Sequence, residues 1–191
     1  MIKFINLSPK KPFQIFKKFY DKANKKKQDN IEAVCISSYS HSNRSVNSRF
    51  VNLKIINNEE FIFFTNYNSP KAKEFQEHDQ ISAVFFWSTI NTQIRFKASI
   101  AKIPNEFNEK YFKNRSETKN ALAIASSQSS KIQSYEEVKK KYSDTLKNED
   151  LKKCPSYWGG FSFKPYYFEF WEGHESRINR RRVFKFTNDN W

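Results

Sequence analysis

The segment from Cys154 to Arg182 combines residue types that could hold a flat, anionic ligand. It contains two of the chain's four tryptophans, Trp158 and Trp171, and the pair Gly159-Gly160 in a chain with three glycines. It ends in a cluster of arginines, namely Arg177, Arg180, Arg181 and Arg182. The planar guanidinium of arginine binds phosphate or carboxylate through two parallel hydrogen bonds and keeps its charge. A tight turn, aromatic rings and fixed cations would suit such a ligand, although a buried strand pair with a solvated basic end has the same composition.

Two pairs of residues in the first half of the chain could bind a phosphate. Arg49 and Lys54 lie five residues apart on one predicted strand, so a regular strand would point them to opposite faces. Both can reach one ligand only if one of them lies at a strand end or a bulge. Thr65 and Lys71 bracket a predicted helix start at Ser69-Pro70, where free N–H groups and the helix dipole favour an anion.

The second half of the chain adds two further groups of this kind. Gln128-Ser129-Ser130 is a polar run that can donate hydrogen bonds to a phosphate. Arg177 and Arg181 are four residues apart, and we expect them on one face of a strand. Taken alone, each of the four groups is also typical of a solvated surface.

Residues for nucleophilic or metal chemistry do not group in the sequence. No Ser-His-Asp or Cys-His arrangement and no carboxylate pair stands out, and the three histidines are scattered. Cys35 and Cys154 have no zinc spacing, so we predict no metal site. If the chain is an enzyme, a cofactor carries the chemistry and the protein positions it.

Hydrophobic periodicity predicts six or seven strands, mostly linked as hairpins, with helices around them. The predicted strands are residues 31–38, 46–56, 60–66, 80–87, 92–103, 161–171 and 176–187. One predicted helix begins at Pro12. The other predicted helices cover residues 70–78, 105–115, 118–126 and 135–147, and a capping box from Ser134 to Glu137 opens the last of them. Residues 1–10 are expected to form an arm. The pattern predicts a mainly β (α+β) fold, an antiparallel barrel with peripheral helices, and one domain over residues 1–191.

The composition limits the partners. The net charge of +14 favours anionic partners, but the lysines are spread along the chain and are typical of a solvated surface. A nucleic-acid-binding protein more often concentrates its cations on one element, so we predict no nucleic acid as partner. No apolar run approaches the ~18–20 residues of a membrane span, and the first residues lack the apolar core of a signal peptide, so we predict a cytoplasmic protein without a membrane partner.

Two motifs near the C-terminus carry a family resemblance. F-E-F-W-x(5)-R-I-N-x-R, residues 168–181, resembles the closing signature of the pyridoxamine 5'-phosphate oxidase family, and S-Y-W-G-G-F, residues 156–161, resembles the family's P-S-F-W-G-G segment. The resemblance runs from about Phe13 to Trp191. It implies a split β-barrel homodimer with FMN at the subunit interface. It also implies oxidation of pyridoxamine or pyridoxine 5'-phosphate to pyridoxal 5'-phosphate, with oxygen as the acceptor.

The resemblance assigns FMN contacts residue by residue. Arg49-Phe50-Val51-Asn52-Leu53-Lys54 is similar to the family's R-x-V-x-L-K, and Phe64-Thr65 is similar to its Y-T pair. The other positions that match FMN-binding motifs are Lys71, Gln93, Gln128, Ser129, Trp171 and Arg181. In the implied dimer, Gln93 and Arg181 of one subunit meet a flavin held by Arg49 and Thr65 of the other.

The resemblance also implies a substrate site. Tyr111 and Arg115, in K-Y-F-x-x-R, match residues that grip the substrate phosphate, and Arg177 matches an arginine above the substrate ring. The full implied substrate set is Lys54, Tyr111, Arg115, Lys119, Arg177 and Asn179, with Arg177 and Asn179 in catalytic roles.

Several positions depart from the family pattern. Pro70 replaces an arginine that binds the FMN phosphate, Lys119 replaces a serine at the substrate phosphate, and Asn179 replaces a histidine. The N-terminal arm is short, and the chain stops at Trp191, before the usual R-L-x-P ending. These departures leave two alternatives open within the fold: a related FMN-dependent oxidase of another substrate, as in phenazine-type pathways, or an FMN-binding protein with little turnover. A basic nucleic-acid-binding barrel is the alternative from another class.

Overall fold

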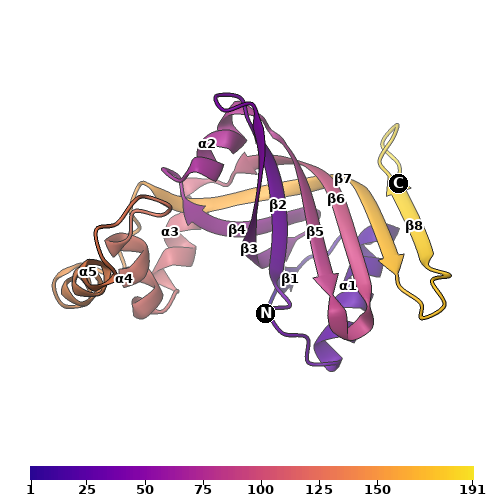
Figure 1. Cartoon of the computed structure of the whole chain (residues 1–191), viewed down its shortest axis with the longest axis horizontal. Helices are drawn as coiled ribbons and strands as arrows, with labels where there is room; N and C mark the ends of the chain where they lie inside the picture. The colour runs from indigo at the N-terminus through magenta and orange to yellow at the C-terminus, as the bar shows by residue number, and fades with distance from the viewer.

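The computed structural model describes residues 1–191, and its centre is a closed ring of six antiparallel strands (Figure 1). The six strands are β2 (Ala33–Ser40), β3 (Ser45–Asn57), β4 (Glu60–Asn66), β5 (Gln80–Trp87), β6 (Thr92–Lys102) and β7 (Trp158–Glu172). Their order is β3-β2-β5-β6-β7-β4, and the pairing of β4 with β3 closes the ring. The predicted mainly β barrel with helices around it is confirmed.

Two short strands lie outside this ring, and both correct the sequence prediction. β1 (Lys3–Ile5) pairs in parallel with the end of β3, so part of the expected arm is a strand and the sheet is mixed rather than purely antiparallel. β8 (Arg180–Lys185) pairs with β7 but begins four residues later than the predicted strand at 176. Arg177 lies in the preceding loop with a φ of 61°, a left-handed conformation that ends regular strand geometry there.

An aromatic core fills the barrel and is sealed by helix α1 (Lys11–Lys25). Phe13 and Phe16 of α1 are fully buried, as the predicted helical stripe requires. The ring of Phe16 lies 5.3–5.8 Å from four aromatic rings of the barrel, those of Phe61, Phe85, Trp87 and Phe96. Burial of each such side chain stabilises the fold by about 1.5–3 kcal/mol.

The remaining helices lie around the barrel. α2 (Pro70–Glu77) and the 3-10 turn η1 (Ser88–Ile90) flank β5, and α3 (Asn105–Lys113) follows β6. α4 (Glu117–Ala125) and α5 (Tyr135–Asn148) project from the barrel on the side away from β8 (Figure 1). Ser134 caps α5 as predicted, because its Oγ accepts the Glu137 N–H at 3.1 Å, while the Glu137 carboxylate pairs with Lys141 at 2.7 Å. None of the five α-helices is long and apolar enough to span a membrane.

Strands β3 and β4 pair only over part of their length. Their pairing runs from Asn57 opposite Glu60 to Leu53 opposite Phe63, with a register shift between Leu53 and Ile55. Beyond this point β3 continues along β2, while β4 continues along β7 to Asn66 opposite Trp158. On the sides where β3 and β4 face each other, residues 45–52 of β3 and 64–66 of β4 are therefore not paired with one another. This separation opens the barrel wall.

The Gly159-Gly160 pair lies at the start of β7 rather than in a tight turn. The two glycines pair with Thr65 and Phe64 on β4. A Cβ on Gly159 would collide with the hydroxyl of Tyr67, and one on Gly160 would lie 2.5 Å from Ile103 Cδ1. Two glycines here let α3 and the segment after β4 approach the strand closely.

Candidate functional site

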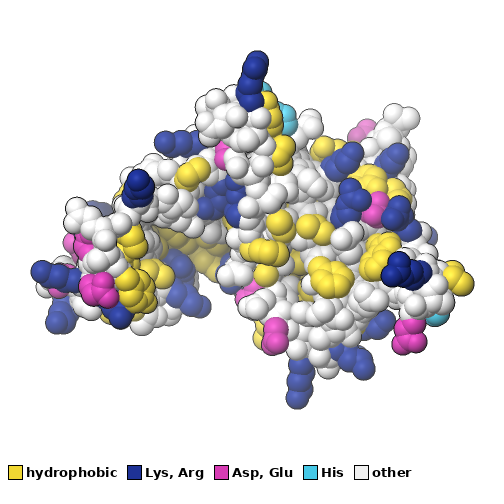
Figure 2. All heavy atoms as spheres, in the orientation of Figure 1, with side chains coloured by type: hydrophobic (Ala, Val, Ile, Leu, Met, Phe, Trp, Pro, Cys, Tyr) yellow, Lys and Arg dark blue, Asp and Glu magenta, His cyan; other side chains and the backbone are white.

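A cavity of about 440 Å³ opens where β3 and β4 separate. Its lining consists of twelve residues, all of which are among the candidates named from the sequence. They are Arg49, Phe50, Val51, Asn52, Lys54, Phe64, Thr65, Lys71, Tyr111, Arg115, Gln128 and Ser129. Four of them are cationic and none is a carboxylate, so the cavity favours an anion. The space-filling view shows Lys and Arg side chains gathered in the hollow between the projecting helices and the barrel (Figure 2).

The β3 irregularity explains how Arg49 and Lys54 reach one cavity. The sequence required a strand end or a bulge for this, and Lys54 lies within the register shift between Leu53 and Ile55. Leu53 itself is fully buried in the core, so its side chain does not line the cavity. Lys54 also pairs with Glu32 at 3.5 Å.

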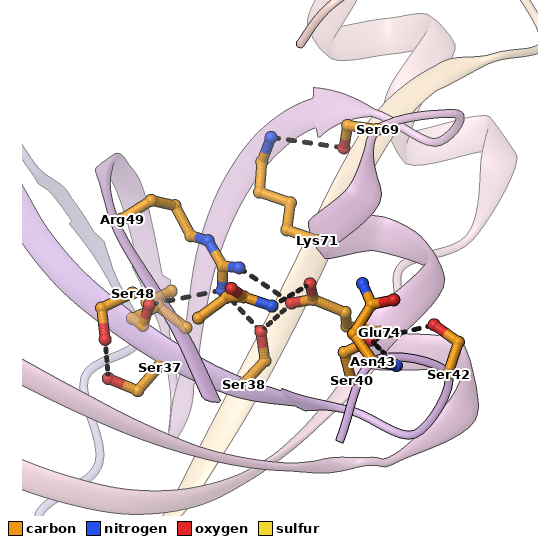
Figure 3. A network of polar contacts seen from close by, with 12 residues as sticks. Ser37, Ser38, Ser40, Ser42, Asn43, Ser48, Arg49, Ser69, Lys71 and Glu74 are labelled. Carbon is orange, nitrogen blue, oxygen red and sulfur yellow. Dashed lines mark hydrogen bonds and ion pairs between the residues drawn. The ribbon is translucent and has the colours of Figure 1, made fainter. Parts of the chain in front are cut away.

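A buried polar network holds Arg49 beside the cavity (Figure 3). Its Nη2 donates to Glu74 Oε2 at 2.8 Å, and Asn47 Nδ2 donates to Glu74 Oε1 at 2.9 Å. Ser38 Oγ also donates to Glu74. These contacts join β2, β3 and α2. Glu74, Ser38 and Asn47 were missed from the sequence; the available signal was that Glu74 follows Lys71 by three residues on one face of a helix.

Lys71 is a nearly buried cation, 8 % exposed, at the start of α2. Its Nζ donates to Ser69 Oγ at 3.2 Å. The pKa of Lys71 is lowered to about 8, mainly because burial removes water from the ammonium group and also because the Arg49 charge lies nearby; Glu74 opposes this shift. A buried ammonium whose charged form is disfavoured in this way would be stabilised by a bound anion.

Gln128 ties the segment after α4 to the end of β4. Its Oε1 accepts the Thr65 hydroxyl at 2.8 Å and the Asn66 N–H at 3.0 Å, which leaves its amide N–H donors without a protein partner. The next residue, Ser129, has a φ of 66°. Such left-handed conformations of non-glycine residues cluster where loops contact ligands.

An aromatic stack forms the wall beside Arg115. The ring of Phe64 stacks on Tyr111 with centroids 3.9 Å apart and on Trp158 with centroids 5.0 Å apart, and the Arg115 guanidinium lies 5.0 Å over Trp158. Trp158 is 5 % exposed and does not line the cavity, so it supports the wall from behind. Burial raises the pKa of Tyr111 and lowers that of Arg115. The Tyr111 hydroxyl therefore stays protonated and can donate a hydrogen bond.

Lys119 lies next to this wall. It lines a smaller hollow of about 180 Å³ that adjoins the main cavity through Phe64, Thr65, Arg115 and Gln128.

Three other candidate residues lie side by side on β6, β7 and β8 and not at the cavity. Gln93 of β6 is paired with Trp171 of β7, which is paired with Arg181 of β8. None of them lines the cavity. Arg181 Nε lies 3.6 Å from the buried carboxylate of Glu169.

Arg177 and Asn179 lie in the loop between β7 and β8, away from the cavity lining. The expectation that Arg177 shares a strand face with Arg181 is wrong, because β8 begins only at Arg180. Arg177 is exposed, and Asn179 Oδ1 accepts the His174 N–H at 3.0 Å.

Comparison with known proteins decides the family. A model described as "Pyridoxamine 5'-phosphate oxidase" matches residues 21–146, and one described as "Pyridoxine 5'-phosphate oxidase C-terminal dimerisation region" matches residues 158–191. This chain belongs to the pyridoxamine 5'-phosphate oxidase family. It is an oxidoreductase, in agreement with the enzyme class that the resemblance implied.

Related members of the pyridoxamine 5'-phosphate oxidase family are similar along most of the chain. Pyridoxine/pyridoxamine 5'-phosphate oxidase 1 of Hydrogenovibrio crunogenus is 34 % identical over 171 residues, 89 % of this chain and 79 % of the relative. The pyridoxine/pyridoxamine 5'-phosphate oxidase of Leptospira biflexa is 34 % identical over 182 residues, 94 % of this chain and 85 % of the relative.

Solved structures show the same split-barrel fold. PhzG from Burkholderia lata 383, solved with tetrahydrophenazine-1-carboxylic acid, matches with a TM-score of 0.89 at 22 % identity, covering 96 % of this chain and 90 % of that one. A pyridoxamine 5'-phosphate oxidase-related, FMN-binding protein from Nostoc punctiforme matches with a TM-score of 0.78 at 11 % identity, covering 95 % and 94 %. At these sequence identities, the similarity to the solved structures shows the fold alone.

Proposed function

We propose that the chain is an FMN-dependent oxidase of pyridoxamine or pyridoxine 5'-phosphate that works as a homodimer. The observation that carries the proposal is the cavity at the β3–β4 separation, whose twelve lining residues coincide with positions matching FMN and substrate motifs. Relatives named pyridoxine/pyridoxamine 5'-phosphate oxidase at 34 % identity support the substrate.

The cavity fits the phosphate of FMN. Lys71 and Arg49 are adjacent cations, and their nearest carboxylate, Glu74, balances one positive charge of the two. An anion would complete this charge balance and raise the lowered pKa of Lys71. In the proposed complex Arg49 and Lys71 hold the phosphate, with the Thr65, Gln128 and Ser129 segment as hydrogen-bonding wall.

A second group of lining residues fits the substrate phosphate. Lys54, Tyr111 and Arg115 share the cavity lining, and Tyr111 keeps its proton and can donate. We propose that these side chains orient the substrate, and that Arg177 and Asn179 act from above the substrate ring. When bound, FMN supplies the hydride acceptor that oxygen reoxidises. No protein nucleophile is then required.

A homodimer would explain why five candidate residues lie away from the cavity of their own chain, namely Gln93, Trp171, Arg177, Asn179 and Arg181. Gln93, Trp171 and Arg181 form one row on the outer face of the sheet, and the exposed Phe86 lies opposite Gln93 on β5. The matched C-terminal region carries a dimerisation description, which supports a second copy covering this face. In such a dimer the row of one subunit would complete the cavity of the other.

The test uses the purified protein with its flavin. We expect a yellow protein whose released flavin is FMN, and bleaching of the flavin when pyridoxamine 5'-phosphate is added without oxygen. Pyridoxamine without its phosphate is the matched control and should bleach the flavin far more slowly. Flavin that stays oxidised with both pyridoxamine and pyridoxine 5'-phosphates would contradict this substrate.

A second substrate class is favoured by Lys119. This cation lies beside Arg115 in the adjoining hollow and would suit an aromatic substrate with a larger or differently placed anionic group. Anaerobic bleaching by an aromatic carboxylate, with no response to the B6 phosphates, would support this alternative.

A further inference from the structure

Glu74 is a buried carboxylate beside a site built to hold an anion. It is 6 % exposed and does not line the cavity, yet it contacts Arg49, which does. A negative charge so close to a phosphate site should weaken phosphate binding by simple electrostatics. The geometry around Arg49 gives the carboxylate a different role.

Three of the five N–H donors of Arg49 have protein acceptors. Nη1 donates to the Ile36 carbonyl oxygen at 3.5 Å and to Ser38 Oγ, and Nη2 donates to Glu74 Oε2 at 2.8 Å. Ser38 Oγ itself donates to the same oxygen of Glu74, so these two acceptors lie next to each other (Figure 3). They therefore occupy the end of the guanidinium, between Nη1 and Nη2.

The two donors that remain are the Nε–H and the second Nη2–H. These lie on one side of the guanidinium and form the fork that binds two oxygens of a phosphate in parallel. Arg49 lines the cavity, so this is the fork that a ligand meets. The second arginine of the lining, Arg115, lies over Trp158 instead.

We propose that Glu74 is a positioning residue that, together with Ser38, occupies the end of the Arg49 guanidinium and turns its side fork towards the flavin phosphate. The proposal rests on the proposed function, since it takes the anion at Arg49 to be FMN. Asn47 holds the other oxygen of Glu74 at 2.9 Å and so fixes the carboxylate from β3. A guanidinium fixed in advance loses less freedom when the phosphate binds, which increases affinity.

This role and simple charge repulsion predict opposite signs. If Glu74 only cancels positive charge, its removal should tighten FMN binding. If Glu74 positions Arg49, its removal frees the guanidinium to rotate and should weaken FMN binding. Riboflavin, which lacks the phosphate, should be insensitive in the second case.

The experiment measures the dissociation constants of FMN and riboflavin with flavin-free protein, by quenching of flavin fluorescence. We expect Glu74→Ala to weaken FMN about ten-fold with riboflavin unchanged. Glu74→Gln keeps an acceptor oxygen without the charge and should lose about three-fold. Glu77→Ala, on the exposed face of the same helix, removes the same charge without touching Arg49 and should leave both constants unchanged.

Tighter or unchanged FMN binding in Glu74→Ala would overturn the proposal, as would an equal loss for riboflavin, which indicates a general collapse of the site. If Glu74→Ala does not fold, Ser38→Ala removes one hydroxyl from the same network and should weaken FMN alone by about three-fold; no loss there would overturn it equally. Wild-type protein that binds riboflavin as tightly as FMN would instead contradict the proposed function.

Discussion

The rings of Phe64 and Tyr111 stack face to face, 3.9 Å apart at an angle of 14°. Phe64 lies on β4 and Tyr111 on α3, so the stack joins the open edge of the barrel to the helix that leads to Arg115. Asn108 supports the same junction, because its Oδ1 accepts the Gly160 N–H at 2.8 Å. The residues proposed to bind the substrate phosphate thus owe their positions to aromatic packing as well as to hydrogen bonds.

We expect Phe64→Leu to lower both stability and substrate affinity. An aromatic pair contributes about 0.5–1.5 kcal/mol beyond its buried area, so the free energy of unfolding in urea should fall by at least that amount. The KM for the phosphorylated substrate should rise several-fold as α3 loosens. Tyr111→Phe keeps the stack and removes the hydroxyl, so it should raise KM without lowering the unfolding free energy. Equal stability of Phe64→Leu and wild type would contradict this account.

FMN affinity should decrease as the pH rises through about 8. The pKa of Lys71 is lowered to about 8 in the flavin-free protein, while a phosphate monoester with a second pKa near ~6 is already a dianion there. Above this pH, binding must take up a proton, so the dissociation constant of FMN should grow by up to about ten-fold per pH unit. Lys71→Ala should weaken FMN by about ten-fold or more at pH 7 and flatten the pH dependence. Riboflavin titrations provide the control and should show neither effect.

The stability of the flavin-free protein should have the opposite pH dependence at the same residue. The folded pKa of Lys71 lies below its ordinary value of 10.5, so the unfolded chain holds more protons between about pH 8 and 10.5. The Lys71 contribution to the free energy of unfolding should therefore rise with pH across that window. The difference between wild type and Lys71→Ala in urea unfolding, measured at pH 7.5 and pH 9.5, isolates this contribution. A difference that does not change with pH would show that burial does not perturb Lys71.

Much of the fold could be predicted because period-2 and period-3.6 patterns report burial directly. Ile94, Phe96, Ala98 and Ile100 alternate in the sequence and are all buried in β6. Residues 1–10 gave no such signal, since β1 is three residues long and is set by pairing with β3. The predicted start of β8 was wrong because Arg177 has a left-handed backbone conformation, which an arginine in a sequence does not indicate.

The cavity itself could be predicted only as a set of residues. Motif positions named all of its lining, and the resemblance implied that Gln93 and Arg181 serve the flavin of another subunit. The motifs could not show that Gln93, Trp171 and Arg181 are neighbours on three adjacent strands, because that depends on the strand register. Glu74 was missed because a glutamate on a short polar helix is ordinarily a surface residue.

We expect Phe86→Glu to dissociate the proposed homodimer. Phe50 and Phe86 are 74 % and 57 % exposed on the outer face of the sheet, and hydrophobic side chains are scattered over this face at β2, β3 and β5 (Figure 2). A charge buried in an apolar interface without a partner is strongly unfavourable. Sedimentation should show a monomer, with FMN affinity reduced because Gln93 and Arg181 of a second copy are lost. Tyr135→Glu, at an exposed aromatic residue of α5, is the control and should remain dimeric. A flavin-loaded wild-type monomer would contradict the dimer.

The last prediction concerns the loop between β7 and β8. Arg177 and Asn179 lie in this loop and not on β8, and the Asn179 side chain closes it by accepting the His174 N–H at 3.0 Å. Asparagine can hold a loop and hydrogen-bond a substrate, but it cannot carry a proton near neutral pH. If this position moved a proton, general acid–base help of roughly 10²–10⁴-fold would be missing from the enzyme.

We expect Asn179 to orient the substrate instead, since hydride transfer to a flavin needs no protein nucleophile. Arg177→Ala should then nearly abolish turnover while FMN stays bound, because a cation at the position proposed for Arg177, above the substrate ring, would stabilise developing charge. Asn179→Asp keeps the acceptor and should retain the loop, whereas Asn179→His should raise kcat only modestly. A gain of about 100-fold or more in Asn179→His, with a new ionisation near pH 6.5 in the kcat profile, would show that this position transfers a proton.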